Sequence, residues 1–391
     1  FLSYLYRTVN AVIAPNLTQD LGLDPGSLGL LTSTYFLTFA LFQLPLGVLL
    51  DRFGPRRVEA ALLLVAAAGA LIFAQAETLT GLLVGRALIG LGVSACLMAA
   101  FKAFVIWLPP ERLPLANGVQ MISGGIGALA ATTPVEAALR VTDWRGVFLV
   151  VGVLTLLAAI ILFLVVPEKQ EPASGETLQQ QINGVGQVLA SPFFWSIAPW
   201  AIMAQAAYLS LVGLWAGPWL RDMAGLARMD VAGTLMWVAI AMTCGYLTFG
   251  LLAERLSRRG VPPMQVAACG MGLFLVVQVL LTLPWLSAAV PLWLSFGFCG
   301  TACILPYAVL SQGFPRHLAG RVNTGLNVFV FVAAFAAQWT IGLIIGLWPE
   351  TAAGGYHPNG YRAGFGTLVV LQVLAAGWYL YSRKQELRRM D

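Results

Sequence analysis

The chain has 391 residues, of which 59% are apolar and only 10% are charged, and its formal net charge is +5. A soluble domain carries roughly 25% charged residues and cannot expose so much apolar surface to water, so the composition excludes an ordinary soluble protein. The positive charge does not indicate nucleic-acid binding, because the basic residues lie in short segments between apolar runs and not on an aromatic-rich face.

Apolar runs separated by charged residues, proline and glycine predict twelve membrane-spanning helices. In chain order the predicted spans are 1–17, 28–50, 58–76, 79–107, 114–137, 146–166, 192–220, 230–252, 262–283, 289–313, 322–347 and 363–382. The longest polar stretch falls within 167–191 and is typical of a solvated linker. We therefore expect an all-α membrane protein: an N-terminal six-helix bundle at 1–166, a cytoplasmic linker at 167–191 and a C-terminal six-helix bundle at 192–391. The two bundles are expected to be pseudo-symmetric and to enclose a central cavity.

The distribution of lysine and arginine predicts the orientation in the membrane. These residues are concentrated on the linker's side of the predicted spans, as at Arg57, Arg258 and Lys384, and are fewer on the opposite side, as at Arg140 and Arg228. The positive-inside rule then places the linker and the C-terminus in the cytoplasm. We expect the chain to reside in a bacterial cytoplasmic (inner) membrane. Because the first apolar run begins at the first residue, we also expect the natural N-terminus to lie upstream.

Three sequence patterns recur in the same order in the two halves. The matching pairs are Gly47–Arg52 with Gly250–Arg255, Asn117–Gly118 with Asn323–Gly325, and Trp144–Phe148 with Tyr361–Phe365. Parallel repeats of this kind place a substrate site near the bilayer midplane, between the halves. Alternating access then follows from rocking one half against the other.

The segment after the second predicted span carries a recognisable motif. It reads Gly47-Val-Leu-Leu-Asp51-Arg52-Phe-Gly54-Pro55-Arg56-Arg57. This resembles the G-x-L-x-D-R-x-G-R-K signature of the major facilitator superfamily, and the likeness extends over essentially the whole chain. Pro55 takes the first of the two final basic positions, and Arg56 takes the second.

The resemblance implies a twelve-helix secondary transporter in which this cluster latches one conformation. The latch assigned here comprises Gly47, Asp51, Arg52, Gly54, Arg56, Glu254 and Arg255. The alternative is that these charges only set the topology. In the fourth span, Arg86-Ala-Leu-Ile89-Gly90-Leu-Gly92 resembles the family's R-x-x-Q-G-x-G element, which is associated with proton coupling, with Ile89 in place of the usual polar residue.

Three basic residues lie inside predicted spans, where an ionisable group usually faces a wet cavity. They are Arg7, Arg86 and Lys102, and no acidic residue lies as deep. Arg86 and Lys102 differ by about 160° around a regular helix, so both cannot line one cavity. Lys102 is close to the span's end and can snorkel to the interface. Arg86 can instead bond to a helix end.

The predicted substrate-binding residues combine two arginines with neutral polar side chains. Tyr4, Arg7 and Asn10 recur every third residue and form one polar stripe on the first span. The complete predicted set is Tyr4, Arg7, Asn10, Arg86, Gln120, Gln205, Tyr208, Trp215, Tyr307 and Asn327. The resemblance implies a cavity lined by helices 1, 4, 7 and 10 with helices 2, 5, 8 and 11 along its sides. Each neutral residue can instead make an interhelical hydrogen bond.

Lone arginines without acidic partners predict a secondary active transporter for a small organic or inorganic anion, since a guanidinium matches carboxylate or phosphate. The alternative is efflux of lipophilic drugs or metabolites by proton antiport, which the 12 Trp and 21 Phe favour. Coupling protons could ride on the substrate or on Glu136, or one anion could be exchanged for another. A channel is a further alternative.

An enzyme is not expected from this sequence. Both histidines, His317 and His357, fall in loops or at span ends, which argues against paired-histidine haem or metal sites in the bilayer. The chain has no P-loop, and its five cysteines all lie in apolar spans as small packing residues. We expect no metal, no cofactor and no nucleic-acid partner. The expected partners are a small-molecule substrate, membrane lipid and protons as the coupling ion, with the chain acting as a monomer.

Overall fold

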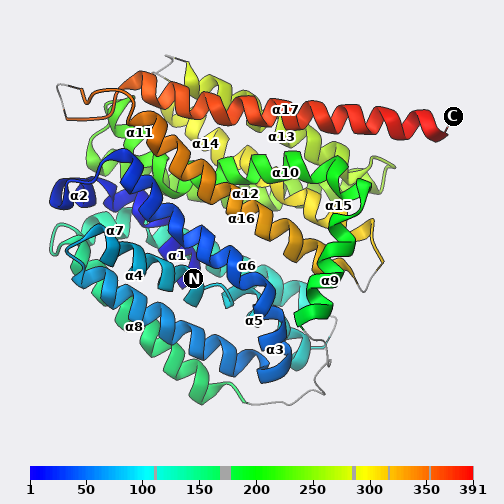
Figure 1. Cartoon of the computed structure of the whole chain (residues 1–391), viewed down its shortest axis with the longest axis horizontal. Coiled ribbons are helices and arrows are strands. Elements are labelled where there is room, and N and C mark those ends of the chain that lie inside the picture. The colour runs from blue at the N-terminus through cyan, green and yellow to red at the C-terminus, as the bar shows by residue number, and fades with distance from the viewer. Residues whose placement is uncertain (110–111, 168–177, 284–287, 316–317, 352–353, 391) are drawn as a thin grey trace.

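The computed structural model describes residues 1–391 except 110–111, 168–177, 284–287, 316–317, 352–353 and 391. Two groups of helices lie side by side, the first half of the chain in blue to cyan and the second in green to red (Figure 1). The first half contains α1 (Leu2–Thr8), α2 (Asn10–Leu21), α3 (Pro25–Gln75), α4 (Leu79–Gly92), α5 (Cys96–Trp107), α6 (Leu113–Ala130), α7 (Thr133–Ala138) and α8 (Trp144–Val165). After α9 (Leu178–Leu189), the second half contains α10 (Pro192–Ser210), the π-helix η2 (Leu211–Trp215), α11 (Ala216–Asp222), α12 (Arg228–Ser257), α13 (Pro263–Thr282), α14 (Ala289–Gly300), the 3₁₀-helix η4 (Thr301–Ile304), α15 (Leu305–Gln312), α16 (Ala319–Ile345) and α17 (Pro358–Met390).

The helices confirm the predicted all-α architecture of twelve spans. Within the described residues, 9 helical stretches are long and apolar enough to cross a membrane. One of them, α3, covers both the second and the third predicted spans. The first and fifth predicted spans correspond to the pairs α1–α2 and α6–α7.

The two spans within α3 are separated at Gly54, which has φ 77° and ψ 160°. An L side chain rarely adopts this backbone conformation, so glycine is required where the chain reverses direction. Asp51 therefore lies in the last turn of the helix before the reversal.

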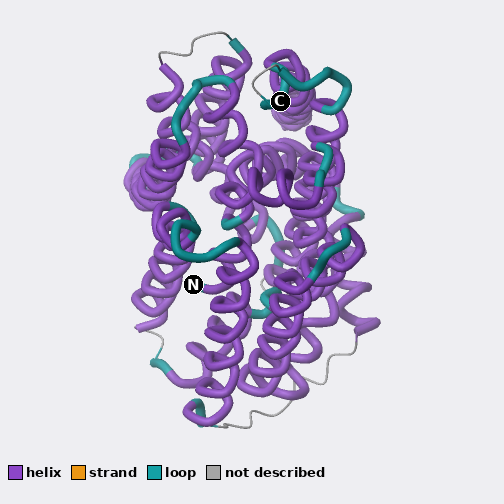
Figure 2. The backbone as a smooth tube through the Cα atoms, turned by 90° about the vertical axis from the view of Figure 1, so that its left-hand side faces the viewer, coloured by secondary structure: helices purple, strands orange, loops and turns teal. Residues whose placement is uncertain are grey.

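The ends of the spans define two faces of the molecule. The linker face carries Gly54, α9 and the C-terminal end of α17, on the right in Figure 1. The far face carries the opposite helix ends, including the turns at Gly22 and Gly225, and Figure 2 looks onto it.

The predicted solvated linker contains a helix that the sequence interpretation did not foresee. In α9, the side chain of Val188 is fully buried, and α9 contacts both α16 and α3. Residues 168–177 of the predicted linker lie outside the described part of the chain. The linker is therefore only partly solvated, because one apolar face of α9 packs on both halves.

Close contact between the halves on the far face depends on a glycine. A Cβ added to Gly342 of α16 would lie 2.2 Å from the carbonyl oxygen of Pro25 in α3. No side chain fits in this space, so the two backbones approach directly. The halves are thus packed tightly together at the far face.

Candidate functional site

One cavity of about 310 Å³ lies between the halves, within the size range of small-molecule sites. Its walls come from α1, α2, α3, α5 and α6 of the first half and from α10, η2, α12, η4, α15 and α16 of the second. These elements belong to spans 1, 2, 4, 5, 7, 8, 10 and 11, as the family resemblance implied. The lining residues include Tyr4, Arg7, Thr8, Phe39, Gln43, Ser94, Gln120, Gln205, Tyr208, Tyr246, Tyr307, Asn323, Asn327 and Phe331.

Arg7 is the one charged side chain among the described lining residues, and it lies among aromatic rings. Its Cζ atom is 4.9 Å from the ring centre of Tyr4, 5.6 Å from that of Phe39 and 5.5 Å from that of Phe331. Phe331 belongs to the second half, so the guanidinium lies where the halves meet. No ion pair joins Arg7 to a described carboxylate, and its Nε has no hydrogen-bond partner.

Arg7 lies near the boundary between α1 and α2, where the backbone at Val9 stays helical, with φ −56° and ψ −31°. α1 ends at Thr8 and α2 begins at Asn10. The carbonyl of Tyr6 accepts a hydrogen bond from Nη1 of Arg86 over 2.8 Å. Arg86 therefore ties α4 to the first span beside Arg7.

Arg86 does not line the cavity, although the sequence predicted a substrate contact for it. Its side chain is only 1% exposed, and its Cζ lies 5.0 Å from the ring centre of Tyr35. The same ring centre lies 5.9 Å from Cζ of Arg7. Tyr35 is thus in contact with both arginines, and Arg86 reaches the cavity only through its neighbours.

Two further predicted site residues make hydrogen bonds outside the cavity. Asn10 is fully buried and donates its amide N–H to Oγ1 of Thr32 over 3.0 Å. Trp215 is also fully buried and donates Nε1–H to the carbonyl of Gln338 over 3.0 Å. Neither lines the cavity. Both make the interhelical hydrogen bonds that the sequence analysis held open as the alternative role.

The other predicted residues all line the cavity. Those of the first half are Tyr4 and Gln120, and those of the second half are Gln205, Tyr208, Tyr307 and Asn327. The hydroxyl of Tyr307 donates to Oδ1 of Asn327 over 2.7 Å. This pair orients the amide group of Asn327 in the cavity wall. The second half therefore contributes neutral polar groups to the site.

The sequence reasoning did not select Tyr246, Gln43 or Phe39 for the cavity. A signal was present for Tyr246, because Ala239, Met242 and Tyr246 follow helical spacing on α12 and all line the cavity. For Gln43 and Phe39, no signal separated the cavity face of α3 from its other faces.

The predicted latch residues lie at the linker face, away from the described cavity lining. Asp51 forms an ion pair with Lys102 of α5, a partner that the sequence analysis had weighed as a cavity residue. Arg56 donates Nε–H to the carbonyl of Phe163 in α8 over 2.8 Å. These contacts tie the reversal in α3 to neighbouring helices of the same half.

The remaining latch residues make local contacts. Cζ of Arg52 lies 5.3 Å from the ring centre of Phe53. In the second half, Glu254 pairs with Arg258 one turn later, at 2.6 Å, and Arg255 is exposed beside it. Their function as a latch stays a prediction.

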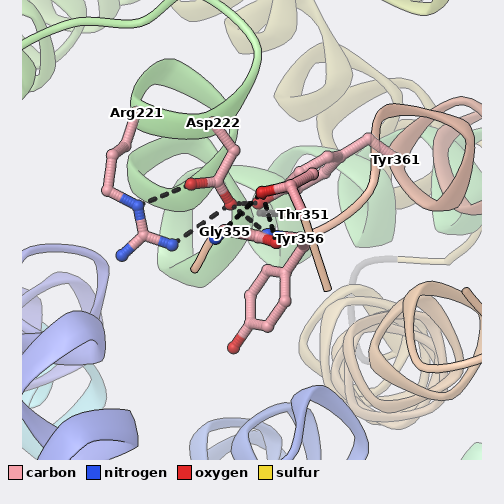
Figure 3. A network of polar contacts seen from close by, with 6 residues as sticks. All are labelled: Arg221, Asp222, Thr351, Gly355, Tyr356 and Tyr361. Atoms are coloured by element: carbon pink, nitrogen blue, oxygen red, sulfur yellow. Dashed lines mark hydrogen bonds and ion pairs between the residues drawn. The ribbon is translucent and has the colours of Figure 1, made fainter. Parts of the chain in front are cut away.

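A separate polar cluster on the far face joins elements of the second half (Figure 3). The carboxylate of Asp222 pairs with Arg221 at 2.6 Å and accepts hydrogen bonds from the Tyr356 N–H at 3.0 Å and the Tyr361 hydroxyl at 2.7 Å. The cluster fixes α11 to the segment before α17 through Tyr356 and to α17 itself through Tyr361. Because the acid already has three partners, the cluster is not a second substrate site.

The fold and the cavity define a class of protein: a helical membrane protein whose two similar bundles share one central site. A sequence profile of the Major Facilitator Superfamily matches residues 1–338. The chain belongs to this superfamily.

Curated relatives and solved structures agree with this assignment. The chain is 27% identical over 183 residues to a probable sulfoacetate transporter of Cupriavidus necator, covering 46% of this chain and 43% of the relative. It is 27% identical over 223 residues to the hexuronate transporter of Escherichia coli K12, covering 53% and 52%. These matches span about half the length of the relatives, which are named as transporters and not as enzymes. The crystal structure of a bacterial homologue of the human lysosomal transporter Spinster, inward-facing and occupied, superposes with a TM-score of 0.80 at 20% identity, covering 98% of this chain and 94% of that one.

Proposed function

We propose that this protein is a secondary active transporter that moves a small anion across the membrane by alternating access. The observation that carries the proposal is Arg7, a cation in the central cavity without an acidic partner among the described residues. A charge in low-dielectric surroundings is costly unless it is paired, so the site favours an incoming counter-ion. The planar guanidinium fork suits a carboxylate or sulfonate group.

The lining of the second half refines the substrate class. Tyr208, Tyr307 and Asn327 offer hydroxyl and amide groups but no charge. Such groups recognise hydroxyl or carbonyl oxygens, so the proposed ligand has one anionic end toward Arg7 and a neutral polar end toward the second half. Relatives named for sulfoacetate and hexuronate support this class.

The apolar lining favours a second candidate, efflux of lipophilic compounds by proton antiport. Phe39, Phe101 and Phe331 line the same cavity. Aromatic rings beside a cation also serve an anion site, however, because they hold the guanidinium in place. Resistance of expressing cells to a panel of lipophilic dyes, with no anion uptake, would favour this second candidate.

The membrane setting and the coupling complete the proposal. The linker face is assigned to the cytoplasm of a bacterium, as the positive-inside rule predicts, and the chain works as a monomer in contact with membrane lipid. Protons are the proposed coupling ion. Transport of a proton together with the anionic substrate would make the rate of anion uptake depend on pH. Measuring uptake over a range of pH therefore tests the proposed coupling.

Uptake by purified protein in proteoliposomes tests the anion site. Arg7→Gln should reduce uptake of labelled hexuronate or sulfoacetate roughly 10- to 100-fold, because hydrogen bonds to charged groups contribute about 1.5–3 kcal/mol. Arg7→Lys keeps the charge and should retain part of the rate. Arg221→Gln is the matched control, since Arg221 lies outside the cavity lining, and should leave uptake unchanged.

Two further results decide between mechanisms. Saturable uptake that is accelerated by unlabelled anion on the other side indicates a carrier, whereas an ohmic current indicates a channel. Unchanged uptake kinetics in Arg7→Gln would remove Arg7 from the site and end the anion proposal.

A further inference from the structure

On the far face, a single arginine of the second half bonds to two helices of the first half. Arg228 is the first residue of α12. Its Nε lies 2.7 Å from Oε1 and 2.9 Å from Oε2 of Glu136 on α7. Its Nη2 also donates to Oδ1 of Asn16 on α2.

The burial of the two ionic partners is unequal. The Glu136 side chain is 6% exposed, whereas that of Arg228 is 45% exposed. A buried carboxylate that loses its partner is strongly disfavoured, while an exposed guanidinium can return to water. The buried Glu136 carboxylate therefore favours the ion pair, and the pair can break when the Arg228 guanidinium moves into water.

The position of the contact connects it to the cavity. The backbone N–H of Glu136 donates to the carbonyl of Thr132 over 3.0 Å, and Thr132 lines the cavity. At the adjacent residue, Oγ1 of Thr133 lies 3.7 Å from Sδ of Met236 in α12. The Arg228 contact thus lies one helical turn beyond the far end of the cavity, where the halves must part to open it.

We propose that Asn16, Glu136 and Arg228 form a far-face lock, which holds the two halves together and must break each time the cavity opens to that face. The proposal rests on the alternating-access part of the proposed function but not on the anionic nature of the substrate. Arg145 offers a comparison on the same face: it pairs with Asp20 at 3.7 Å within one half and cannot lock the halves together.

Thiol labelling tests the lock without any substrate. The full chain, with its five cysteines replaced by serine, carries Thr132→Cys as a reporter at the cavity end. A membrane-impermeant maleimide is added at the far face of sealed vesicles of known orientation. Glu136→Gln and Arg228→Gln should each raise the labelling rate, roughly 3- to 10-fold, because the far-open state becomes more populated. Arg145→Gln should label at the parental rate.

A charge-reversed double variant separates charge from packing. Glu136→Arg combined with Arg228→Glu should return labelling toward the parental rate, because the ion pair is restored across the same interface. Parental labelling rates in both single variants, with size-exclusion profiles showing folded protein, would overturn the lock. A rate increase that the double variant does not reverse would assign the effect to packing and would also overturn it. Faster labelling without any anion uptake would leave the lock standing and defeat the proposed substrate.

Discussion

At the scale of single residues, Arg7 and Arg86 carry the same side chain but have different roles because their contacts differ. Both lie deep in spans of the first half, and both are near the ring of Tyr35. Arg7 faces the cavity with an unpartnered Nε, whereas Arg86 donates to the carbonyl of Tyr6 and is closed off from the cavity. We therefore expect Arg7 to govern transport and Arg86 to govern stability.

Arg86→Met should destabilise the protein by about 1–3 kcal/mol, because it leaves the Tyr6 carbonyl buried without a partner. Arg86→Lys can still donate to that carbonyl and should be affected less. Thermal unfolding of purified protein in detergent measures the difference. Arg7→Gln serves as the control and should change uptake much more than it changes the unfolding temperature. Equal unfolding temperatures for Arg86→Met and the parent would refute the supporting role.

Sequence alone could predict that Arg7 lines a cavity. It could not tell that Asn10 and Arg86 lie outside the cavity lining. The charge of Arg7 in an apolar span and its spacing from Tyr4 indicated a cavity. The same spacing extended the stripe to Asn10, but the Asn10 side chain bonds to Thr32 instead of lining the cavity. A hydrogen bond between two helices depends on tertiary packing that hydropathy does not report.

At the scale of elements, hydropathy predicted the position of every span but not how spans join. It separated 28–50 from 58–76, and the structure shows the reversal at Gly54. The family motif marked this glycine without giving its conformation. The helix α9 was missed because its apolar residues are interspersed with glutamine, asparagine and glycine and form no long apolar run. Its burial is a tertiary effect, arising from contacts with α16 and α3.

Gly54→Ala should destabilise the reversal in α3 by about 1–3 kcal/mol, since φ 77° with ψ 160° is strained for any residue with a Cβ. The effect is purely conformational, because no atom lies within 4 Å of the added methyl group. Gly250→Ala is the matched control: its added Cβ is equally free, and its backbone is helical. That control should be neutral or slightly stabilising. Thermal unfolding of both variants measures the difference in stability. Equal losses of stability in the two variants would show that backbone strain at Gly54 is not the cause.

At the scale of the whole molecule, the contacts differ between the two faces. On the far face, the Arg228 contact and the close approach at Gly342 hold the halves together. On the linker face, the Asp51–Lys102 pair and the Arg56 contact lie within one half. At the linker face, α9 also packs on both halves. The twofold repeat in sequence predicted two halves, but it carried no information on which contacts join them at either face.

Packing at Gly342 should therefore control the balance between the two open states. Gly342→Ala places a methyl group 2.2 Å from the Pro25 carbonyl oxygen, so the halves must separate at the far face to accommodate it. Spin labels at Glu77→Cys and Leu347→Cys, on exposed far-face ends of the two halves, should report a longer distance in this variant by pulsed electron-spin resonance. Gly320→Ala, in the same helix with open space around the added methyl group, should leave the distance unchanged. An unchanged distance in Gly342→Ala, with folded protein and normal uptake, would mean that the halves do not need this close approach to seal the far face. The methyl group acts on the closed state alone, so anion uptake should slow as the far-closed population falls.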